Sequence, residues 1–537
     1  MLILAFVTIS SINGFGLFSK ANQVKNMYDN SYEEDEISSV TGALHNYLHV
    51  DTNGTTTEDS TIEGISIASY DDLTIVAGNK GTPRLLLEYS SDVKVNITYL
   101  SGNTSIATIN SVTGEVTGKS AGTATMTVTI ISNNSIKETA TCTVTVQTAV
   151  AQVGTGATAV YYASLQSAID AVPTTNEETA VTLLTDTTEC AMVKTNQNVY
   201  LNLNGKTLTG ATISGYNMVM GDDEMNCDGL EVALITLANA TLTLSNGTIE
   251  SVLVINNGTF TMIDGTIESA VYNIGTFTMI DGTITSGSNN NEPVLDYGTF
   301  TMTGGTISEV GGDGGVAVFV YTHGAFIMTG GTISAVGGNN IRGVRYYSDG
   351  EMCITGGTIS ASANGGSCEG VFIFSTTNDA KITITGVTIE VNSGFAVYSL
   401  DNIIISNVTI NAGSGSVVST NEEAVLYNCT ITGTIGSCFG QVVNITTTPG
   451  TGYKIEYYEG NISTTSVQFQ TWCDADKAGT MYNYSSTKQT TANGTAWVCT
   501  VNKSNHQNKT GAYTTDVYVT TGSGTSMVMD ISGIINI

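Results

Sequence analysis

The chain has 537 residues, too many for one ordinary globular core, so we expect several domains or a long repeat array. Its formal net charge is −30, so the basic footprint that binding to DNA or RNA requires is missing, and we expect no nucleic-acid partner. Only 12% of the residues are charged and 59 are glycine, which favours an all-β, turn-rich fold.

Residues 1–50 predict an N-terminal helix, because an apolar start is followed by a segment with helical periodicity. The stretch LILAFVTISSINGFGLFSKANQVKNMYDNSYEEDEISS resembles the type IV pilin-like N-terminal helix of Gram-positive surface proteins. That resemblance implies association with a membrane or a filament. The family's basic leader, and its acidic residue after the processing site, have no counterpart here. An ordinary helix or a signal remnant is the alternative, and residues 51–60 predict a polar linker.

Residues 61–149 contain short alternating runs separated by turn signals, which predicts a β-sandwich. Within them, SIATINSVTGEVTGKSAGTATMTVTI (105–130) resembles the bacterial immunoglobulin-like group 2 family. The resemblance implies a spacer or adhesive module of an extracellular protein, without catalytic residues.

Residues 161–447 predict a capped repeat array. The segment YYASLQSAIDAVP predicts a short amphipathic helix that covers the open end of the array. Variants of one unit, such as NIGTFTMIDGTITSG (273–287), then recur along the chain, and the isoleucine after each glycine corner marks the register. These isoleucines are Ile249, Ile267, Ile284, Ile307, Ile333, Ile359, Ile389, Ile410 and Ile431.

The parity of each unit predicts which side chains face the core. In GTFTM the phenylalanine and the methionine share one face of a strand, and the threonines share the other. We therefore expect an inner phenylalanine ladder and a second inner ladder beside it. The two ladders contain Phe260, Phe277, Phe300 and Phe326, and Met262, Met279, Met302, Met328, Ile354, Ile384 and Ile405.

This array resembles the pectin lyase-like β-helix superfamily, and more closely the Gly-Thr-rich surface β-helices of gut-type bacteria. The resemblance implies a right-handed parallel β-helix. With the sandwich before it and a second one after it, the expected fold is an all-β chain in which a parallel β-helix is flanked by two immunoglobulin-like β-sandwiches.

Residues 450–537 are richer in aromatic residues and lysine and resemble the Bsp-like repeat of Gram-positive wall-associated proteins. That family implies an immunoglobulin-like β-sandwich outside the cell. The residues that carry the resemblance are Trp472, Tyr484 to Gln489, Gly494, Trp497, Val501, His506, Asn508, Gly511, Tyr513, Val517 and Tyr518. Of the nine cysteines, Cys473 and Cys499 are the candidate disulfide, because both lie beside a tryptophan in this region. The alternative is that the cysteines are small apolar fillers in strands.

Two candidate binding sites lie in the array. Aromatic residues and both of its arginines gather between Ile307 and Ile389, and if Val318 and Val344 point inward, their neighbours point outward. Aromatic faces beside an arginine could stack on sugars, and such outward side chains should contribute little packing. Ring stacking that only stabilises the sheet is the alternative. The candidates are Phe319, Tyr321, Arg342, Arg345 and Tyr347.

The second candidate is the acidic loop GDDEMNCDGLE (221–231), where oxygen-bearing side chains fall at alternate positions, as in loops that bind hard cations. These candidate calcium ligands are Asp222, Glu224, Asn226 and Asp228. A solvated acidic loop is the alternative, and calcium is the only cofactor that the sequence suggests.

We assign no catalytic residues. Polygalacturonase-like chemistry needs clustered carboxylates near a His-Gly and an Arg-x-Lys pair, but Asp222-Asp223 and His323-Gly324 lie several repeats apart and Arg-x-Lys does not occur. The sequence therefore favours an extracellular, adhesin-like or structural cell-surface protein that binds a glycan, cell wall or protein receptor. A polysaccharide lyase or glycoside hydrolase and a pilin-like filament subunit are the alternatives.

Overall fold

The chain divides into two compact units, Met1–Thr148 and Ala149–Ile537. The computed structural model describes residues 65–89, 93–133, 135–214, 217–220, 223–285, 292–375, 381–435 and 441–537, and for 217–220 and 223–226 it describes the backbone alone. The fold is all-β, as the composition predicts. The predicted pilin-like helix and polar linker, residues 1–60, lie outside the described residues and stay predictions. Within the described ranges, no helix has both the length and the apolar character that crossing a membrane requires.

The first unit is built from three small sheets. In its longest strands apolar and polar residues alternate, so that Met126 and Ile130 are fully buried while Thr125 is exposed. The sheets have the orders β2-β9-β8-β5, β3-β7-β6 and β1-β4. Their strands are β1 (Ile65–Tyr70), β2 (Leu73–Val76), β3 (Lys80–Gly81), β4 (Leu85–Tyr89), β5 (Val95–Ser101), β6 (Ala107–Ile109), β7 (Val116–Gly118), β8 (Gly122–Ser132) and β9 (Lys137–Gln147).

The second unit opens with the predicted cap. Helix α4 (Leu165–Asp170) buries Leu165 and Ile169 against the start of the array, as its periodicity predicts. The Glu189 carboxylate accepts hydrogen bonds from the first two backbone N–H groups of the helix, at 2.8 and 3.0 Å. At the other end, the Gln197 amide donates to two backbone carbonyls at 2.8 and 2.9 Å. The neighbouring elements are β10 (Ala151–Val153), η1 (Gly156–Thr158), β11 (Val160–Tyr162) and β12 (Glu178–Leu183).

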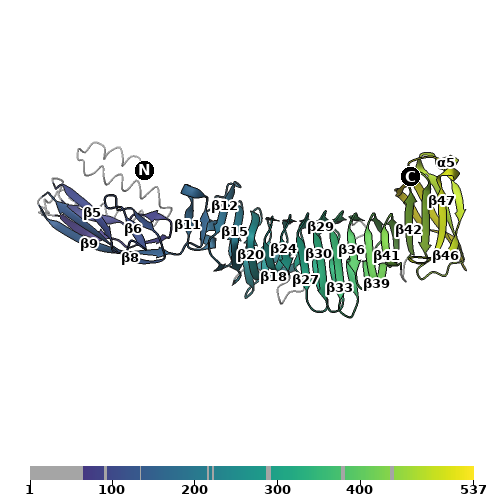
Figure 1. The fold of residues 1–537 in the computed structure, drawn as a ribbon, viewed down its shortest axis with the longest axis horizontal. Helices are drawn as coiled ribbons and strands as arrows, with labels where there is room; N and C mark the ends of the chain where they lie inside the picture. The colour runs from purple at the N-terminus through teal and green to yellow at the C-terminus, as the bar shows by residue number, and fades with distance from the viewer. Residues whose placement is uncertain are drawn as a thin grey trace, which may run out of the picture. The chain divides into compact units, whose positions relative to one another are not determined.

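The array follows as one large sheet in which the strands form three columns, and each strand pairs in parallel with its counterpart in the next repeat (Figure 1). The first column contains β21 (Thr259–Met262), β23 (Thr276–Met279), β26 (Thr299–Met302), β29 (Ala325–Met328), β32 (Glu351–Ile354), β35 (Lys381–Thr385), β38 (Ile403–Ser406), β40 (Glu423–Tyr427) and β42 (Gln441–Thr448). The second contains β13 (Thr187–Thr188), β24 (Thr283–Thr285), β27 (Thr306–Val310), β30 (Thr332–Gly337), β33 (Thr358–Ala363), β36 (Thr388–Val391) and β41 (Thr430–Thr434).

The third column carries the candidate binding residues. It contains β14 (Ala191–Val193), β19 (Glu231–Thr236), β25 (Val294–Asp296), β28 (Val316–Thr322), β31 (Ile341–Ser348), β34 (Cys368–Ser375) and β37 (Phe395–Ser399). Four long strands continue from one column into the next: β15 (Asn198–Thr209), β20 (Thr241–Asn256), β22 (Thr266–Asn273) and β39 (Thr409–Thr420). Between β15 and β19 lie three short strands, β16 (Ala211–Thr212), β17 (Asn217–Met220) and β18 (Asp223–Asn226).

Like residues stack on like residues in the core, as the parity of the repeats predicts. Phe260, Phe277, Phe300 and Phe326 are in register and fully buried, and successive ring centroids lie 5.0, 4.8 and 5.4 Å apart. The predicted Met/Ile ladder and the isoleucines after the corners are also in register. No repeat buries its own apolar face, so each one depends on its neighbours for a core.

The glycine corners are required by the close approach of successive repeats. Gly305 and Gly331 both have a positive φ, +77° and +86°. An added Cβ at either position would also lie 2.6 Å from the terminal methyl of the methionine in the preceding repeat, Met279 or Met302. The second residue of each Gly-Gly corner therefore has to be glycine, for its backbone and for its lack of a side chain.

A short polar ladder interrupts the apolar core in the third column. The Asn256 amide donates to the Asn273 side-chain oxygen at 2.7 Å, and the Asn273 amide donates to Asp296 Oδ1 at 2.6 Å. All three side chains are fully buried, and Asp296 Oδ2 has no hydrogen-bond partner within the described part of the chain. Burial raises the pKa of Asp296 to about 7, although the bonds from Asn273 and the Gly298 N–H act in the opposite direction.

Replacing Asp296 by asparagine should remove a pH dependence of stability. Between its ordinary pKa of 3.8 and about 7, the folded state holds a proton that the unfolded state has lost, so stability falls as the pH rises through this window and then levels off. At pH 4.5 the melting curves of Asp296→Asn and of the wild type should nearly coincide. At pH 8 the variant should be more stable by as much as ~4 kcal/mol.

Glu390→Gln, which changes an exposed carboxylate of the array in the same way, is the matched control. Its stability should differ little from that of the wild type at either pH. An Asp296→Asn effect of equal size at pH 4.5 and pH 8 would show that this carboxyl does not titrate in the folded state.

The C-terminal segment continues the sheet of the array. Strand β42, labelled in Figure 1, pairs in parallel with β40 and antiparallel with β43. Its Val443 and Ile445 belong to the same apolar core as Phe469 and Val517. The sheet β43-β47-β46 therefore faces a second sheet of order β45-β44-β48-β49. The elements are β43 (Gly452–Tyr458), β44 (Ser466–Cys473), η2 (Asp474–Asp476), α5 (Lys477–Thr480), β45 (Tyr482–Ser485), β46 (Thr487–Thr491), β47 (Gly494–Asn502), η3 (Lys503–His506), β48 (Ala512–Thr521) and β49 (Gly524–Asn536).

Cys473 and Cys499, the predicted disulfide pair, are both free, buried thiols in this structure, and their pairing stays a prediction. Cys473 ends β44 and lies opposite Tyr513 in one sheet, whereas Cys499 lies opposite Ile455 in β47 of the facing sheet. The two residues come from the same region of the sequence but lie in the two facing sheets of the core. Burial raises the pKa of the Cys499 thiol to about 11, in keeping with a small apolar filler.

Candidate functional site

The predicted binding residues lie on the outer face of the third column. Val318 and Val344 are fully buried, while Phe319, Tyr321 and Arg345 are half-buried with the opposite parity, as predicted. The register extends the set beyond the prediction, to β34 and β37. We call this set the aromatic ridge: Phe319, Tyr321, Arg345, Tyr347, Phe372, Phe374 and Tyr398.

The rings of the ridge stack on one another. Tyr347 lies between Tyr321 and Phe374, with centroid distances of 5.4 and 4.8 Å and interplanar angles of 17° and 12°. Phe372 and Tyr398 stack at 5.2 Å. The prediction that these side chains contribute little packing is therefore wrong. Since neighbouring rings cover both faces of Tyr347, a sugar cannot stack on this ring.

The two arginines of the array occupy different environments. The Arg345 guanidinium lies over the Phe319 ring, 4.5 Å from its centroid, and its Nε has no hydrogen-bond partner in the part of the chain that is described. Arg342 lies 4.8 Å from the Phe372 centroid, and its Nε is 3.2 Å from a Glu369 carboxylate oxygen. Arg342 and Glu369 form a close ion contact without a well-aligned hydrogen bond. Among the described residues, Arg345 thus makes no ion pair of the kind that joins Arg342 to Glu369.

Two carboxyl groups beside the ridge have pKa values that burial raises and that the arginines lower. Burial raises the pKa of Glu369, and the nearby Arg342 offsets part of that rise. Burial likewise raises the pKa of Glu292, with Arg345 acting in the opposite direction. The ridge and its border therefore contain both signs of charge, in a chain whose net charge is −30.

Phe372, Phe374 and Tyr398 were not among the predicted binding residues. Their signal is present in the sequence, because GVFIFS (370–375) and FAVYS (395–399) repeat the alternation of VAVFVYT (316–322). The insertions between these segments differ in length, which hides the register until the isoleucine ladder has been aligned.

The predicted calcium loop falls largely outside the described side chains. Asp222 is not described, and Glu224 and Asn226 are described by backbone alone, in a strand that pairs antiparallel with β17. Asp228 is exposed. Among the residues whose positions are described, no three His, Cys, Asp or Glu side chains lie close enough together to hold a metal ion. Calcium binding by this loop stays a prediction.

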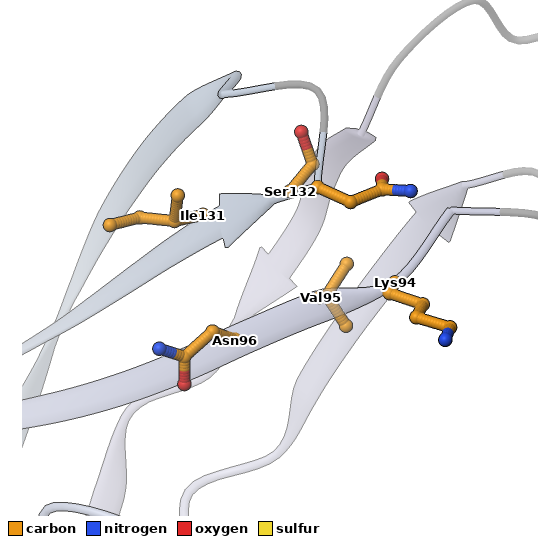
Figure 2. Close-up of a pocket in the computed structure, with 6 residues that line it drawn as sticks. Lys94, Val95, Asn96, Ile131 and Ser132 are labelled. Carbon is orange, nitrogen blue, oxygen red and sulfur yellow. The ribbon is translucent and has the colours of Figure 1, made fainter.

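A shallow depression in the first unit offers no convergent set of polar groups. It is lined by Lys94, Val95, Asn96, Ile131, Ser132 and Asn133 at the ends of β5 and β8. Figure 2 shows the Lys94 amine and the Asn96 amide directed away from each other. Binding sites for small molecules usually place a few polar groups around one point, so this depression is a weaker candidate than the ridge.

His506 has a structural role. It is fully buried at the end of η3, and its Nε2 lies 2.8 Å from the Tyr484 hydroxyl oxygen. Its Nδ1 lies 2.6 Å from the Thr480 carbonyl oxygen, to which the N–H donates. Burial lowers the pKa of His506, so the ring is held neutral between helix α5 and strand β45.

Replacing Tyr347 by alanine should lower stability measurably, because two ring stacks are lost together with buried apolar area. We expect a cost of roughly 2 kcal/mol, measured from thermal or urea unfolding. Tyr347→Phe keeps both stacks and should differ from wild type by less than about 0.5 kcal/mol. Wild-type stability of Tyr347→Ala would show that the outer ladder contributes no packing energy.

Comparison with known proteins provides no relative from which the roles of these residues could be transferred. No family model matches the chain, and no curated protein matches it. The function of the ridge therefore has to be argued from its own geometry.

Proposed function

We propose that this chain is an extracellular, adhesin-like structural protein of a cell surface. In this proposal the central array is a right-handed parallel β-helix, the flanking units are immunoglobulin-like sandwiches, and the aromatic ridge contacts a glycan, a cell wall or a protein on a facing surface. The observation that carries the proposal is the ridge itself: rings and an arginine held at fixed spacing on the outside of a rigid stack.

Three features support a binding scaffold. Both ends of the array are covered, by α4 at one end and by the C-terminal sheets at the other, which protects the exposed strand edges that would otherwise pair with other chains. The inner ladders and the outer side chains lie on opposite faces of the same strands, so outer positions can change while the inner ladders keep their register. Scarcity of charge and abundance of threonine suit a long β-rich surface protein.

The test is retention of the purified chain on immobilised glycans, isolated cell walls and immobilised surface proteins, together with an assay for released reducing sugar. We expect retention on at least one of these surfaces without any release of sugar. Arg345→Gln, which removes the ridge cation but keeps most of its stem over Phe319, should reduce that retention.

Lys381→Gln is the matched control, since Lys381 is an exposed cation of the first column, away from the ridge. Release of sugar from any polysaccharide would contradict the proposal, and so would retention that Arg345→Gln leaves unchanged.

A further inference from the structure

The outer face of the third column is apolar well beyond the ridge. One in-register row of outward positions begins near the start of the array and continues into the ridge. This row contains Met192, Ile235, Ile255, Tyr272, Leu295, Phe319, Arg345, Phe372 and Tyr398. An apolar row of this length on an outer face needs cover from something other than water.

The chain itself covers the first part of this row. Three residues between β15 and β19, Ile213, Cys227 and Leu230, form one apolar cluster with Ile235 and Ile255 of the row. Backbone hydrogen bonds between Ile213 and Leu230 and between Gly229 and Ile213, at 3.0 and 2.9 Å, join the two ends of this segment. At Ile235 and Ile255, the outer face is thus already packed against another part of the same chain.

The stretch of sequence that contains Cys227 and Leu230 has a distinct composition. GDDEMNCDGLE (221–231) combines five carboxylates with apolar side chains. The ridge, in turn, presents ring edges, which carry the positive part of the aromatic quadrupole, and the Arg345 guanidinium. Carboxylate and carbonyl oxygens are the groups that such a surface favours.

The size of the ridge favours a short segment over a folded partner. Neighbouring strands lie about 4.8 Å apart, so β28 to β37 span ~14 Å, which corresponds to roughly four or five residues of extended chain. A standard interface between folded proteins needs about 800 Å² on each partner, and a strip of this length offers much less. At Tyr347, the two stacked neighbours also leave no free ring face for a sugar.

We propose that the aromatic ridge binds an extended polypeptide segment of a partner, with carboxylates and apolar side chains, laid against this face as Ile213, Cys227 and Leu230 are packed against its beginning. This inference rests on the proposed function, in which the ridge is the contact surface. It adds the chemical class of the ligand.

The probe is a random dodecapeptide library displayed on phage, selected on the full chain and counter-selected on Arg345→Gln. We expect enriched peptides that combine Asp or Glu with apolar residues. For a labelled enriched peptide, fluorescence anisotropy should show binding that Arg345→Gln weakens about tenfold, as should replacement of the peptide's carboxylates by amides. Lys381→Gln should bind like wild type, and melting curves should show that both variants are folded.

The outcomes separate the two proposals. Enrichment of peptides without carboxylates, equal binding to Arg345→Gln, or no enrichment at all would overturn the polypeptide inference. If the same variant instead loses retention on a glycan or cell wall, the proposed function stands and only the class of ligand is wrong. If Arg345→Gln changes neither peptide binding nor retention on any surface, both proposals fail.

Discussion

The structure depends on one constraint, the in-register parallel pairing of successive repeats. Pairing of this kind places each side chain directly beside its equivalent in the next repeat, so a phenylalanine meets a phenylalanine and an isoleucine meets an isoleucine. The core is then continuous along the array, although no single repeat has a core of its own. Two requirements follow: corners tight enough to keep the register, and covers for the first and last repeats. The glycines with positive φ meet the first, and α4 and the C-terminal sheets meet the second.

The same constraint shapes the outer face. Because outward positions are also in register, aromatic residues there become a stack whose faces are used up by neighbouring rings, and a cation lies over a ring instead of in solvent. The rings of the ridge therefore restrict one another, which would lower the side-chain entropy lost in the binding that we propose. The constraint also tolerates an ionisable group in the core: Asp296 stands where the preceding repeats have asparagine, and its second oxygen finds no partner among the described residues.

Much of the fold could be predicted from the sequence because the repeats are strongly periodic. The Phe260-to-Phe326 ladder, the face of the cap helix and the inward direction of Val318 and Val344 all follow from parity and spacing alone. Parity predicts which way a side chain points, but it does not predict which neighbouring side chains that side chain contacts. It could not show that the Tyr347 ring would be covered on both faces, or that Cys473 and Cys499 would belong to different sheets. The polar ladder also has a signal in the sequence, because NNG (256–258), NIG (273–275) and DYG (296–298) begin with asparagine or aspartate at equivalent positions.

The most direct test of this account is a double-mutant cycle within the phenylalanine ladder. Phe277 stacks on Phe300 at 4.8 Å, whereas Phe326 lies one repeat further along and meets Phe300 instead. Unfolding free energies of the Phe→Leu single and double variants should give a coupling of roughly 0.5–1.5 kcal/mol for Phe277 with Phe300 and close to zero for Phe277 with Phe326. Equal couplings for the two pairs, or none for Phe277 with Phe300, would contradict a stack held together by in-register neighbours.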